Sequence, residues 1–372
     1  MPNRYLHIIS FDIPYPANYG GVIDVYFKAK ALTEEGVKVI LHCFEYNRKP
    51  SKELESIFEE VHYYKRDISK KHLFKSIPYI VSSRISEKLI ENLLKNDYPI
   101  LMEGLHTSAL LDDDRFNGRK MAVRTHNIEH DYYSNLAKVE NDIFKKYYYY
   151  NEAAKLKRYE ITLAKADKLI CISKNDEKYF ASEFEKVEFI PAFHPFKTVS
   201  SKTGKGDFVL YHGNLSVAEN TNAVRFLVNH VFDTIKVPFK IAGLNPTKQL
   251  RSLVSGMENI ELIANPTDDE LHELIQNAHI NISITAQATG LKLKLLNTLY
   301  NGRYCLVNDK MLSGSNLDKL CIIANDYGSM KRKITSLFKK EFTEIEITKR
   351  KLILTSLYNN GTNTRKLIEL IC

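Results

Sequence analysis

The chain has 372 residues, of which 44% are hydrophobic and 26% are charged, and its formal net charge at pH 7 is +8. These proportions are typical of an ordinary globular protein, and the length exceeds that of one core, which predicts two α/β domains. No apolar run is long enough to span a membrane, and the N-terminus lacks a signal-peptide pattern. We therefore expect neither an integral membrane protein nor a secreted one.

Cysteine usage indicates the cellular compartment. The cysteines lie mostly in apolar runs and show no CxxC spacing, so we expect buried, reduced thiols and a cytoplasmic protein. They are Cys43, Cys171, Cys305, Cys321 and Cys372.

The positive charge indicates an anionic partner. No nucleic-acid-binding motif accompanies it, so we expect no nucleic acid, whereas anionic lipid headgroups or a phosphorylated substrate fit the charge. Segment 63–84 interleaves basic and aromatic residues. We expect this segment either to contact an anionic membrane or to form a charged, solvated pair of helices. Its members are Tyr63, Tyr64, Lys65, Arg66, Lys70, Lys71, Phe74, Lys75, Tyr79 and Arg84.

Strands and helices alternate along the first half. A buried strand is expected at 5–10, then a loop at 12–21 and a helix to Glu35, with Gly36 in the left-handed conformation that ends many helices. Later apolar runs predict further strands, at 37–43, 100–102, 121–125, 169–173 and 187–190.

The pattern breaks at 191–207 and then restarts. Expected strands follow at 208–212, 239–242, 260–263, 280–285 and 304–307, and expected helices at 219–234, 246–255, 267–277 and 290–300. Such alternation predicts parallel sheets. The fold class is therefore α/β, with Rossmann-like domains at 1–190 and 208–343 that face each other across a cleft, a linker at 191–207, and a basic helical segment at 344–372.

Ligands of such domains collect at the carboxyl ends of the strands, in the cleft. Polar or glycine residues occur at these ends in both halves. The His126–Asn127 pair is more typical of a site than of a core, although His126 can also cap the next helix. The candidates are Gly20, Gly21, Glu103, His126, Asn127, Glu129, Gly213 and Asn214.

A phosphate seat is predicted between the strand at 280–285 and the helix at 290–300. Gly290, Lys292 and Lys294 open this helix, where free N–H groups and positive charge favour a phosphate or diphosphate. A solvated helix whose lysines face water fits these residues equally well.

Taken in order, these loops resemble those of the GT-B glycosyltransferases of group 1 (family 4-like). The matching pieces cover nearly the whole chain: 16–21, 124–127, 166–173, 211–214 and 290–302. The resemblance implies that the N-terminal half holds an acceptor and the C-terminal half a nucleotide-diphosphate sugar. It also implies that the C-terminal helix, within 344–372, packs back on the first domain.

The resemblance also assigns roles. Gly20 and Gly21 match the loop that approaches the donor diphosphate, and His126 matches a histidine near the transferred sugar. Lys292 and Lys294 lie where the family contacts phosphate, and we expect them to replace the basic residue that is missing after Gly213.

One departure from the family pattern is large. Two family glutamates, separated by seven residues, correspond here to Thr289 and Asn297. Asn297 can still hydrogen-bond to the donor ribose. Loss of the first glutamate removes the usual contact with a sugar hydroxyl and weakens the expectation of a retaining mechanism.

We therefore expect a hexosyltransferase that assembles a cell-surface polysaccharide on a glycan or lipid-linked acceptor, at the inner face of the plasma membrane. His126 and Glu103 are the expected catalytic residues, and Asn127 and Glu129 lie on the acceptor side. The nucleotide sugar is a co-substrate, and fixed cations with helix-start N–H groups make a metal unnecessary. Two alternatives remain: a sugar-nucleotide epimerase that uses Glu103 and Glu129, and an inactive binding member of the family.

Overall fold

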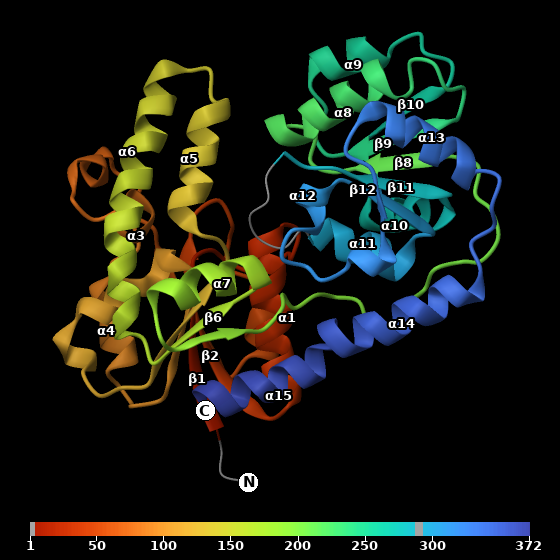
Figure 1. Cartoon of the computed structure of the whole chain (residues 1–372). Helices are drawn as coiled ribbons and strands as arrows, with labels where there is room; N and C mark the ends of the chain where they lie inside the picture. Colours follow the sequence, from red (N-terminus) through yellow and green to blue (C-terminus); the bar gives the residue numbers. More distant parts are fainter. Residues whose placement is uncertain (1–3, 287–292) are drawn as a thin grey trace. The chain divides into compact units, whose positions relative to one another are not determined.

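The computed structural model describes residues 4–286 and 293–372, and the chain forms two compact units (Figure 1). The first unit contains residues 4–195 and 358–372. The second contains the described residues between 196 and 357. Within the described ranges, no helix is both long enough and apolar enough to cross a membrane.

The first unit is built on a seven-stranded parallel sheet in the order β3-β2-β1-β4-β5-β6-β7. The edge strand β3 is not among the expected strands, because its sequence EVHYYK is polar enough to resemble a loop. The strands are β1 (Arg4–Ser10), β2 (Val37–Glu45), β3 (Glu60–Lys65), β4 (Ile100–Glu103), β5 (Met121–Thr125), β6 (Lys168–Cys171) and β7 (Val187–Phe189).

Helices connect these strands, as the sequence pattern predicts. The chain turns after α1 at Gly36, whose φ is +82°. The helices are α1 (Gly20–Glu34), α2 (Lys52–Ile57), α3 (Tyr79–Ser82), α4 (Glu87–Leu93), α5 (Glu129–Val139), α6 (Ile143–Tyr159), α7 (Lys174–Glu183) and α15 (Asn360–Ile371). In Figure 1, α5 and α6 run side by side as an antiparallel pair.

Both faces of this sheet are covered, which explains why its central strands are continuous apolar runs. Alternate residues of β1 enter different cores: Leu6 and Ile8 lie on one side, and Ile9 on the other. The face with Leu6 and Ile8 also packs against α15, which contributes Leu367 and Ile371.

The second unit has a six-stranded parallel sheet in the order β10-β9-β8-β11-β12-β13. Its strands are β8 (Val209–His212), β9 (Phe239–Gly243), β10 (Ile260–Ala264), β11 (Ile280–Ser283), β12 (Tyr304–Val307) and β13 (Ile322–Ile323). Its helices are α8 (Ala218–His230), α9 (Lys248–Val254), α10 (Asp268–Asn277), α11 (Leu293–Asn301), α12 (Asp309–Leu312), α13 (Tyr327–Leu337) and α14 (Glu344–Tyr358). The sequence pattern misses β13, α12 and α13.

The C-terminal segment 344–372 is divided between the units. Residues up to 357, nearly all of α14, group with the second unit, and residues from 358, with α15, group with the first. The residues from 358 onward are hydrogen-bonded within the first unit. His194 Nε2 lies 2.8 Å from the Tyr358 carbonyl, and Asn360 Nδ2 donates to the His194 carbonyl at 2.8 Å.

Segment 63–84 is partly buried and partly exposed, with Lys70, Lys71, Phe74 and Lys75 among its exposed residues, and its contact with an anionic membrane stays a prediction. Tyr64 is buried on β3 and accepts a hydrogen bond from Asn92. Arg84 is also buried, where it donates to the carbonyls of Phe11 and Ile80. These two residues are buried because β3 pairs with β2 in the sheet and the segment that follows β3 covers the core.

All five cysteines carry free thiols. Cys43, Cys171 and Cys305 are buried in strands, as expected. Cys321 is half-buried, and Cys372 is exposed at the end of the chain, so the expectation of burial is wrong for Cys372.

Candidate functional site

A group of buried charged side chains lies at the carboxyl edge of the first sheet. The sheet order reverses between β1 and β4, and ligands of such sheets bind outside the carboxyl ends of the strands at this switch. Glu103 ends β4, and His126 follows β5 directly. Helix α1, which follows β1, presents Asp24 and Lys28 four residues apart, on one face.

Asp24 is held by Arg124 in a two-pronged ion pair. Arg124 Nε and Nη2 donate to the two carboxylate oxygens of Asp24 at 2.9 and 2.8 Å, and the backbone N–H of Phe193 donates to Oδ1 at 2.8 Å. The guanidinium also donates to the carbonyls of Ile190 and Pro191. The guanidinium of this buried arginine is thus hydrogen-bonded to carboxylate and carbonyl oxygens. These bonds offset the cost of burying its charge.

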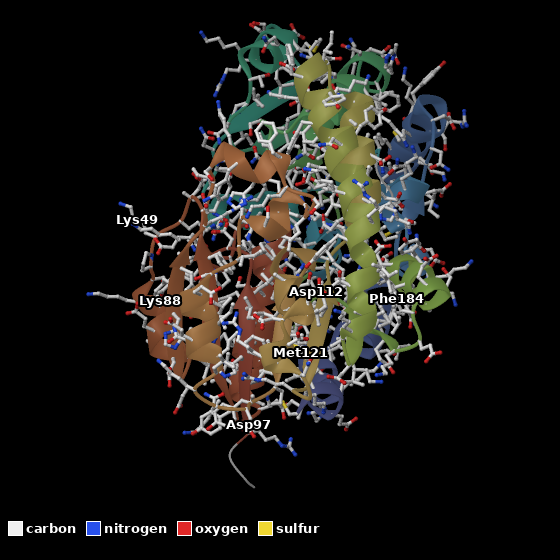
Figure 2. All side chains as sticks on the ribbon, turned by 90° about the vertical axis from the view of Figure 1, so that its left-hand side faces the viewer. Lys49, Lys88, Asp97, Asp112, Met121 and Phe184 are labelled. Carbon is white, nitrogen blue, oxygen red and sulfur yellow. The ribbon has the colours of Figure 1, made fainter. Side chains whose placement is uncertain are left out.

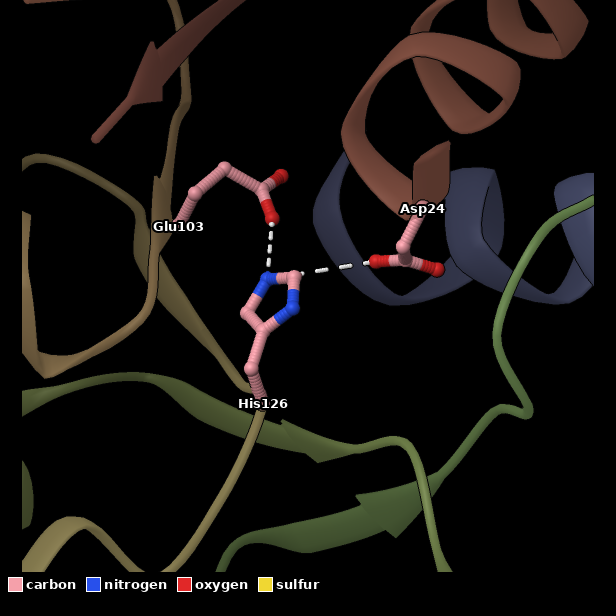
Figure 3. A group of neighbouring side chains, drawn as sticks. All are labelled: Asp24, Glu103 and His126. Carbon is pink, nitrogen blue, oxygen red and sulfur yellow. Dashed lines mark hydrogen bonds and ion pairs between the residues drawn. The ribbon is translucent and has the colours of Figure 1, made fainter. Parts of the chain in front are cut away.

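Lys28 links the two carboxylates. Its Nζ lies 3.0 Å from Asp24 Oδ2 and 2.7 Å from Glu103 Oε1. Glu103 Oε2 in turn lies 3.0 Å from His126 Nε2, and the same nitrogen lies 3.9 Å from Asp24 (Figure 3). The two cations and two anions balance, so the cluster can be buried without a net charge.

The pKa values of the two acids keep both of them ionised. Burial alone raises the pKa of Asp24, but Arg124 and Lys28 overcome this effect and hold the pKa well below its usual range. For Glu103, burial is again opposed, by Lys28 and by the hydrogen bond with His126, and the pKa is lowered.

An ionised Glu103 fixes the state of His126. A carboxylate only accepts hydrogen bonds, so His126 Nε2 carries a hydrogen and donates it. In the neutral ring, Nδ1 then carries the lone pair that can accept a proton or a hydrogen bond. The arrangement gives one histidine a defined orientation and tautomer at the edge of the sheet.

The cluster does not suit a metal ion, although Asp24, Glu103 and His126 offer ligand atoms within 4.8 Å of one another. Lys28 Nζ already bridges the two carboxylates. A divalent cation would have to displace this ammonium group or be repelled by it. The donor set therefore favours a role without a metal.

A second pair lies close by, with Glu129 buried and His106 half-buried. His106, in the 3₁₀ helix Leu105–Asp112, has its Nδ1 4.0 Å from Glu129 Oε1 at the start of α5. Gly104 permits this position, because its φ is +69° and a Cβ there would lie 2.8 Å from His106 Nδ1. Phe11 packs against both His106 and His126, with ring centroids 5.2 and 5.5 Å apart.

Both members of this pair are uncharged near neutral pH. Burial raises the pKa of Glu129 to about 8, although a hydrogen bond with Asn127 acts in the opposite direction. Burial also holds the pKa of His106 well below its usual value, assisted by the positive charge of Arg84. In such a pair, the protonated carboxyl group can donate a proton and the neutral imidazole can accept one.

The glycines of the first unit lie at the start of α1. A Cβ at Gly21 would lie 2.7 Å from Cζ of Phe11, so a larger residue there would require the Phe11 ring to shift. A Cβ at Gly20 would meet nothing within 4 Å. The approach of both glycines to a donor diphosphate stays a prediction.

In the second unit, two of the predicted residues, Gly213 and Lys294, lie beside Asn220 at the end of β8. Lys294 Nζ lies 3.4 Å from Asn220 Oδ1 and 5.4 Å from the centroid of the Tyr211 ring. Gly213 follows β8 at once, and its Cα faces the Asn220 side chain. The carboxyl ends of β8 and β11 form the switch point of this sheet.

Asn214 and Asn297 hold local structure. Asn214 Oδ1 accepts from the N–H and hydroxyl of Ser216, which closes the turn before α8. Asn297 Oδ1 accepts from Asn301 Nδ2 at 2.7 Å. Three further candidates, Thr289, Gly290 and Lys292, lie outside the described residues.

Sequence reasoning missed Asp24, Lys28 and Arg124 as members of the site, and it missed His106. The only sequence signal for the first two is the spacing of an acid and a lysine by four residues on a helix. That spacing is common on solvated helices, and only the order of the strands shows that this face is buried.

Comparison with known proteins gives one relative in sequence. The chain is 30% identical over 341 residues, 86% of this chain and 87% of the relative, to an uncharacterised 44.6 kDa protein in the cps region of Klebsiella pneumoniae. No family model matches the sequence.

Solved structures match along nearly the whole chain. Sucrose-phosphate synthase from Thermosynechococcus elongatus has a TM-score of 0.71 at 12% identity and covers 99% of this chain and 98% of its own. An S. aureus TarM variant, in complex with fondaparinux, α-GlcNAc-glycerol and UDP, has a TM-score of 0.64 at 11% identity, with 100% and 99% covered. These likenesses confirm the expected fold, two Rossmann-like domains of the GT-B type.

Proposed function

The chain belongs to the same family as the uncharacterised 44.6 kDa protein of the Klebsiella pneumoniae cps region, and from this premise and the GT-B fold we propose that it is a glycosyltransferase. It moves a hexose from a nucleotide-diphosphate sugar to a glycan or lipid-linked acceptor. The product belongs to a cell-surface polysaccharide, a role supported by the capsule region of the relative. The proposed reaction takes place in the cytoplasm, at the inner face of the plasma membrane.

The observation that carries this proposal is the ion pair and hydrogen bond chain Lys28–Glu103–His126 at the switch point of the first sheet. Buried charges are expensive and rarely needed for the fold alone. Here they end in one histidine of fixed tautomer, at the edge where such sheets bind ligands. His126 is buried but retains 7% exposure, whereas the side chains of Lys28 and Glu103 have none.

In the proposed reaction, the bond between the sugar's anomeric carbon and the diphosphate breaks, and a bond to an acceptor hydroxyl oxygen forms. The nucleoside diphosphate leaves with the bonding electron pair, and the hydroxyl proton passes to a base or to the leaving phosphate. We assign His126 to the transferred sugar, where its ring orients a hydroxyl group. No metal is required in this scheme, because fixed cations meet the charge of the leaving group.

Lys294 is the described residue best suited to that charge. It lies near the start of α11 and beside the strand end of β8. UDP in the TarM structure makes uridine nucleotides the first donors to test. Retention of the anomeric configuration remains part of the proposal through the resemblance in sequence motifs.

The test is a thermal-shift screen with UDP-, GDP- and dTDP-sugars. A true donor raises the melting temperature in step with its concentration, because it binds only the folded protein. The stabilising sugar nucleotide is then incubated with the protein and an acceptor lipid extract, and release of nucleoside diphosphate is followed. Release that depends on acceptor supports the proposal.

Two other outcomes contradict it. Conversion of the free sugar nucleotide into an epimer, without acceptor, would indicate the epimerase alternative, in which Glu103 and Glu129 act as the acid and base. The opposite protonation of these two carboxyl groups is the observation that favours this second candidate. Stabilisation without any turnover would indicate a binding member of the family.

A further inference from the structure

Helix α6 exposes a row of apolar side chains to solvent. Ile143, Tyr147 and Tyr150 follow one another at helical spacing and are 79%, 75% and 46% exposed. Phe144, beside Ile143, is 88% exposed. These four residues, the α6 stripe, begin where a short loop joins α5 to α6, at the end of the helix pair farthest from the sheet (Figure 1).

The exposed charges of α6 are all basic. Lys145, Lys157 and Arg158 are exposed, and Lys146 is half-buried. The single acid of the helix, Glu152, is buried and lies 2.9 Å from Lys155. Figure 2 views the side of the molecule along which α6 runs, with side chains standing out from the helix.

The acids of the preceding loop are used in the loop itself. Asp142 Oδ1 accepts from the backbone N–H of Lys145 and caps α6. Glu140 Oε1 accepts from the N–H groups of Asn141 and Asp142. These bonds hold the two carboxylates at the backbone of the loop and the helix start, whereas the exposed charges of the helix itself are all basic.

We infer that the α6 stripe and its lysines dock the first unit on the surface of an anionic lipid bilayer. The apolar side chains enter the interface between headgroups and acyl chains, and the lysines face the headgroup phosphates. An amphipathic helix with an apolar stripe and outward charges of one sign has the pattern that binds such surfaces. This inference does not depend on the glycosyltransferase activity.

A second copy of the chain fits the same surface less well. Two copies that met through their α6 stripes would bring Lys145 and Lys146 of each copy close to those of the other, and like charges at an interface repel. The α6 stripe is separate in sequence from segment 63–84, which contacts α6 where the Leu73 carbonyl accepts from Lys155 Nζ at 2.8 Å.

The experiment is sedimentation of the full chain with vesicles of phosphatidylcholine and phosphatidylglycerol, and with vesicles of phosphatidylcholine alone. We expect binding to the anionic vesicles that fades as salt rises. The double variant Ile143→Ser/Phe144→Ser should lower the bound-to-free ratio about tenfold or more, because two exposed apolar side chains are lost. Lys145→Glu/Lys146→Glu should lower it for anionic vesicles only.

Matched controls come from the second unit. Ile345 and Leu352 on α14 are 78% and 73% exposed, so Ile345→Ser/Leu352→Ser removes as much exposed apolar surface elsewhere. Lys339→Glu/Lys340→Glu makes the same change of charge. Both controls should bind like the parent chain, and all variants should keep its melting temperature.

Three results would overturn the inference: no sedimentation of the parent chain, equal binding by the α6 and α14 variants, or equal binding to both kinds of vesicle. Self-association without lipid that Ile143→Ser/Phe144→Ser abolishes would assign the α6 stripe to a second copy of the chain. Because vesicle binding needs no donor or acceptor, failure here leaves the proposed enzymatic activity to its own test.

Discussion

Lys28 Nζ lies 2.7 Å from Oε1 of Glu103, and neither side chain is exposed to solvent. The two residues lie 75 positions apart in the sequence, on α1 and β4. The parallel order β1-β4 brings the start of one and the end of the other together. This contact joins the Asp24–Arg124 pair to His126 and makes one network of four buried charges and a histidine.

Removal of the lysine should be costly. In Lys28→Met, the carboxylates of Asp24 and Glu103 lose a shared cation in a place where water cannot replace it. We expect a loss of about 3–5 kcal/mol in the free energy of unfolding, measured by urea denaturation. Lys38→Met is the control, because Lys38 pairs with Glu59 at the surface, where loss of an ion pair should change the stability little. Equal effects of the two changes would mean that Glu103 is protonated or hydrated in the folded protein.

The sequence predicts the sheet strands and the places where polar residues follow them, because periodicity and strand-end polarity are local properties. It identifies Glu103 and His126 in this way. It does not identify Lys28, because an Asp–Lys pair at i, i+4 looks the same on a solvated helix as on a buried one. Arg124 is hidden for a similar reason, since a basic residue in a strand commonly marks an exposed position.

The α6 stripe shows the opposite difficulty. Ile143, Tyr147 and Tyr150 have the spacing of a face that packs into a core. Periodicity shows that such residues share a face but not what covers that face. At 63–84 the sequence does not show which residues are buried: the short strand β3 buries Tyr64, whereas Phe74 is 89% exposed.

His126 should act in the chemistry and contribute little to the fold. His126→Ala should lower the turnover of the transferase reaction by about two to four orders of magnitude, the range for loss of a positioned polar group. Nucleotide affinity should change little, because the diphosphate-binding residues are proposed in the second unit. His130→Ala is the control, since His130 pairs with the buried Glu160 and lies outside the Lys28–Glu103–His126 chain. A variant of His126 with full activity per folded molecule and a much lower melting temperature would make this residue structural.

Lys294 should contribute to nucleotide affinity. Lys294→Ala is expected to weaken nucleoside-diphosphate binding by roughly 1.5–3 kcal/mol, the loss of one charge-assisted hydrogen bond, as measured by calorimetry. Lys240→Ala in the same unit is the control, because Lys240 pairs with Glu261 near the surface. The double variant Lys292→Ala/Lys294→Ala extends the test to Lys292, which lies outside the described residues. Unchanged affinity in the double variant would reduce both lysines to solvated surface residues.

Glu129 should make the protein less stable as the pH rises. The pKa of its buried carboxyl group is raised to about 8 in the folded protein, above the usual value of 4.5. The folded state therefore holds a proton that the unfolded state releases, and this contribution to stability is complete below pH 4.5 and lost as the pH rises through 8. Glu129→Gln keeps the shape of the neutral acid. We expect its melting temperature to be equal to or lower than that of the parent protein at pH 5, and higher at pH 9. Between these pH values, its free energy of unfolding should rise relative to that of the parent by as much as about 4 kcal/mol.

Glu160→Gln supplies the opposite case. Burial raises the pKa of Glu160, but hydrogen bonds with His130 and Tyr179 overcome this effect and lower it, so the ionised form is the stabilising one. Glu160→Gln should therefore melt below the parent protein at every pH between 6 and 9. The contrast between the two variants separates a specific carboxyl group from a general effect of pH. If Glu129→Gln follows the parent protein at both pH values, Glu129 is ionised in the folded state, and the protonated acid beside His106 must be abandoned.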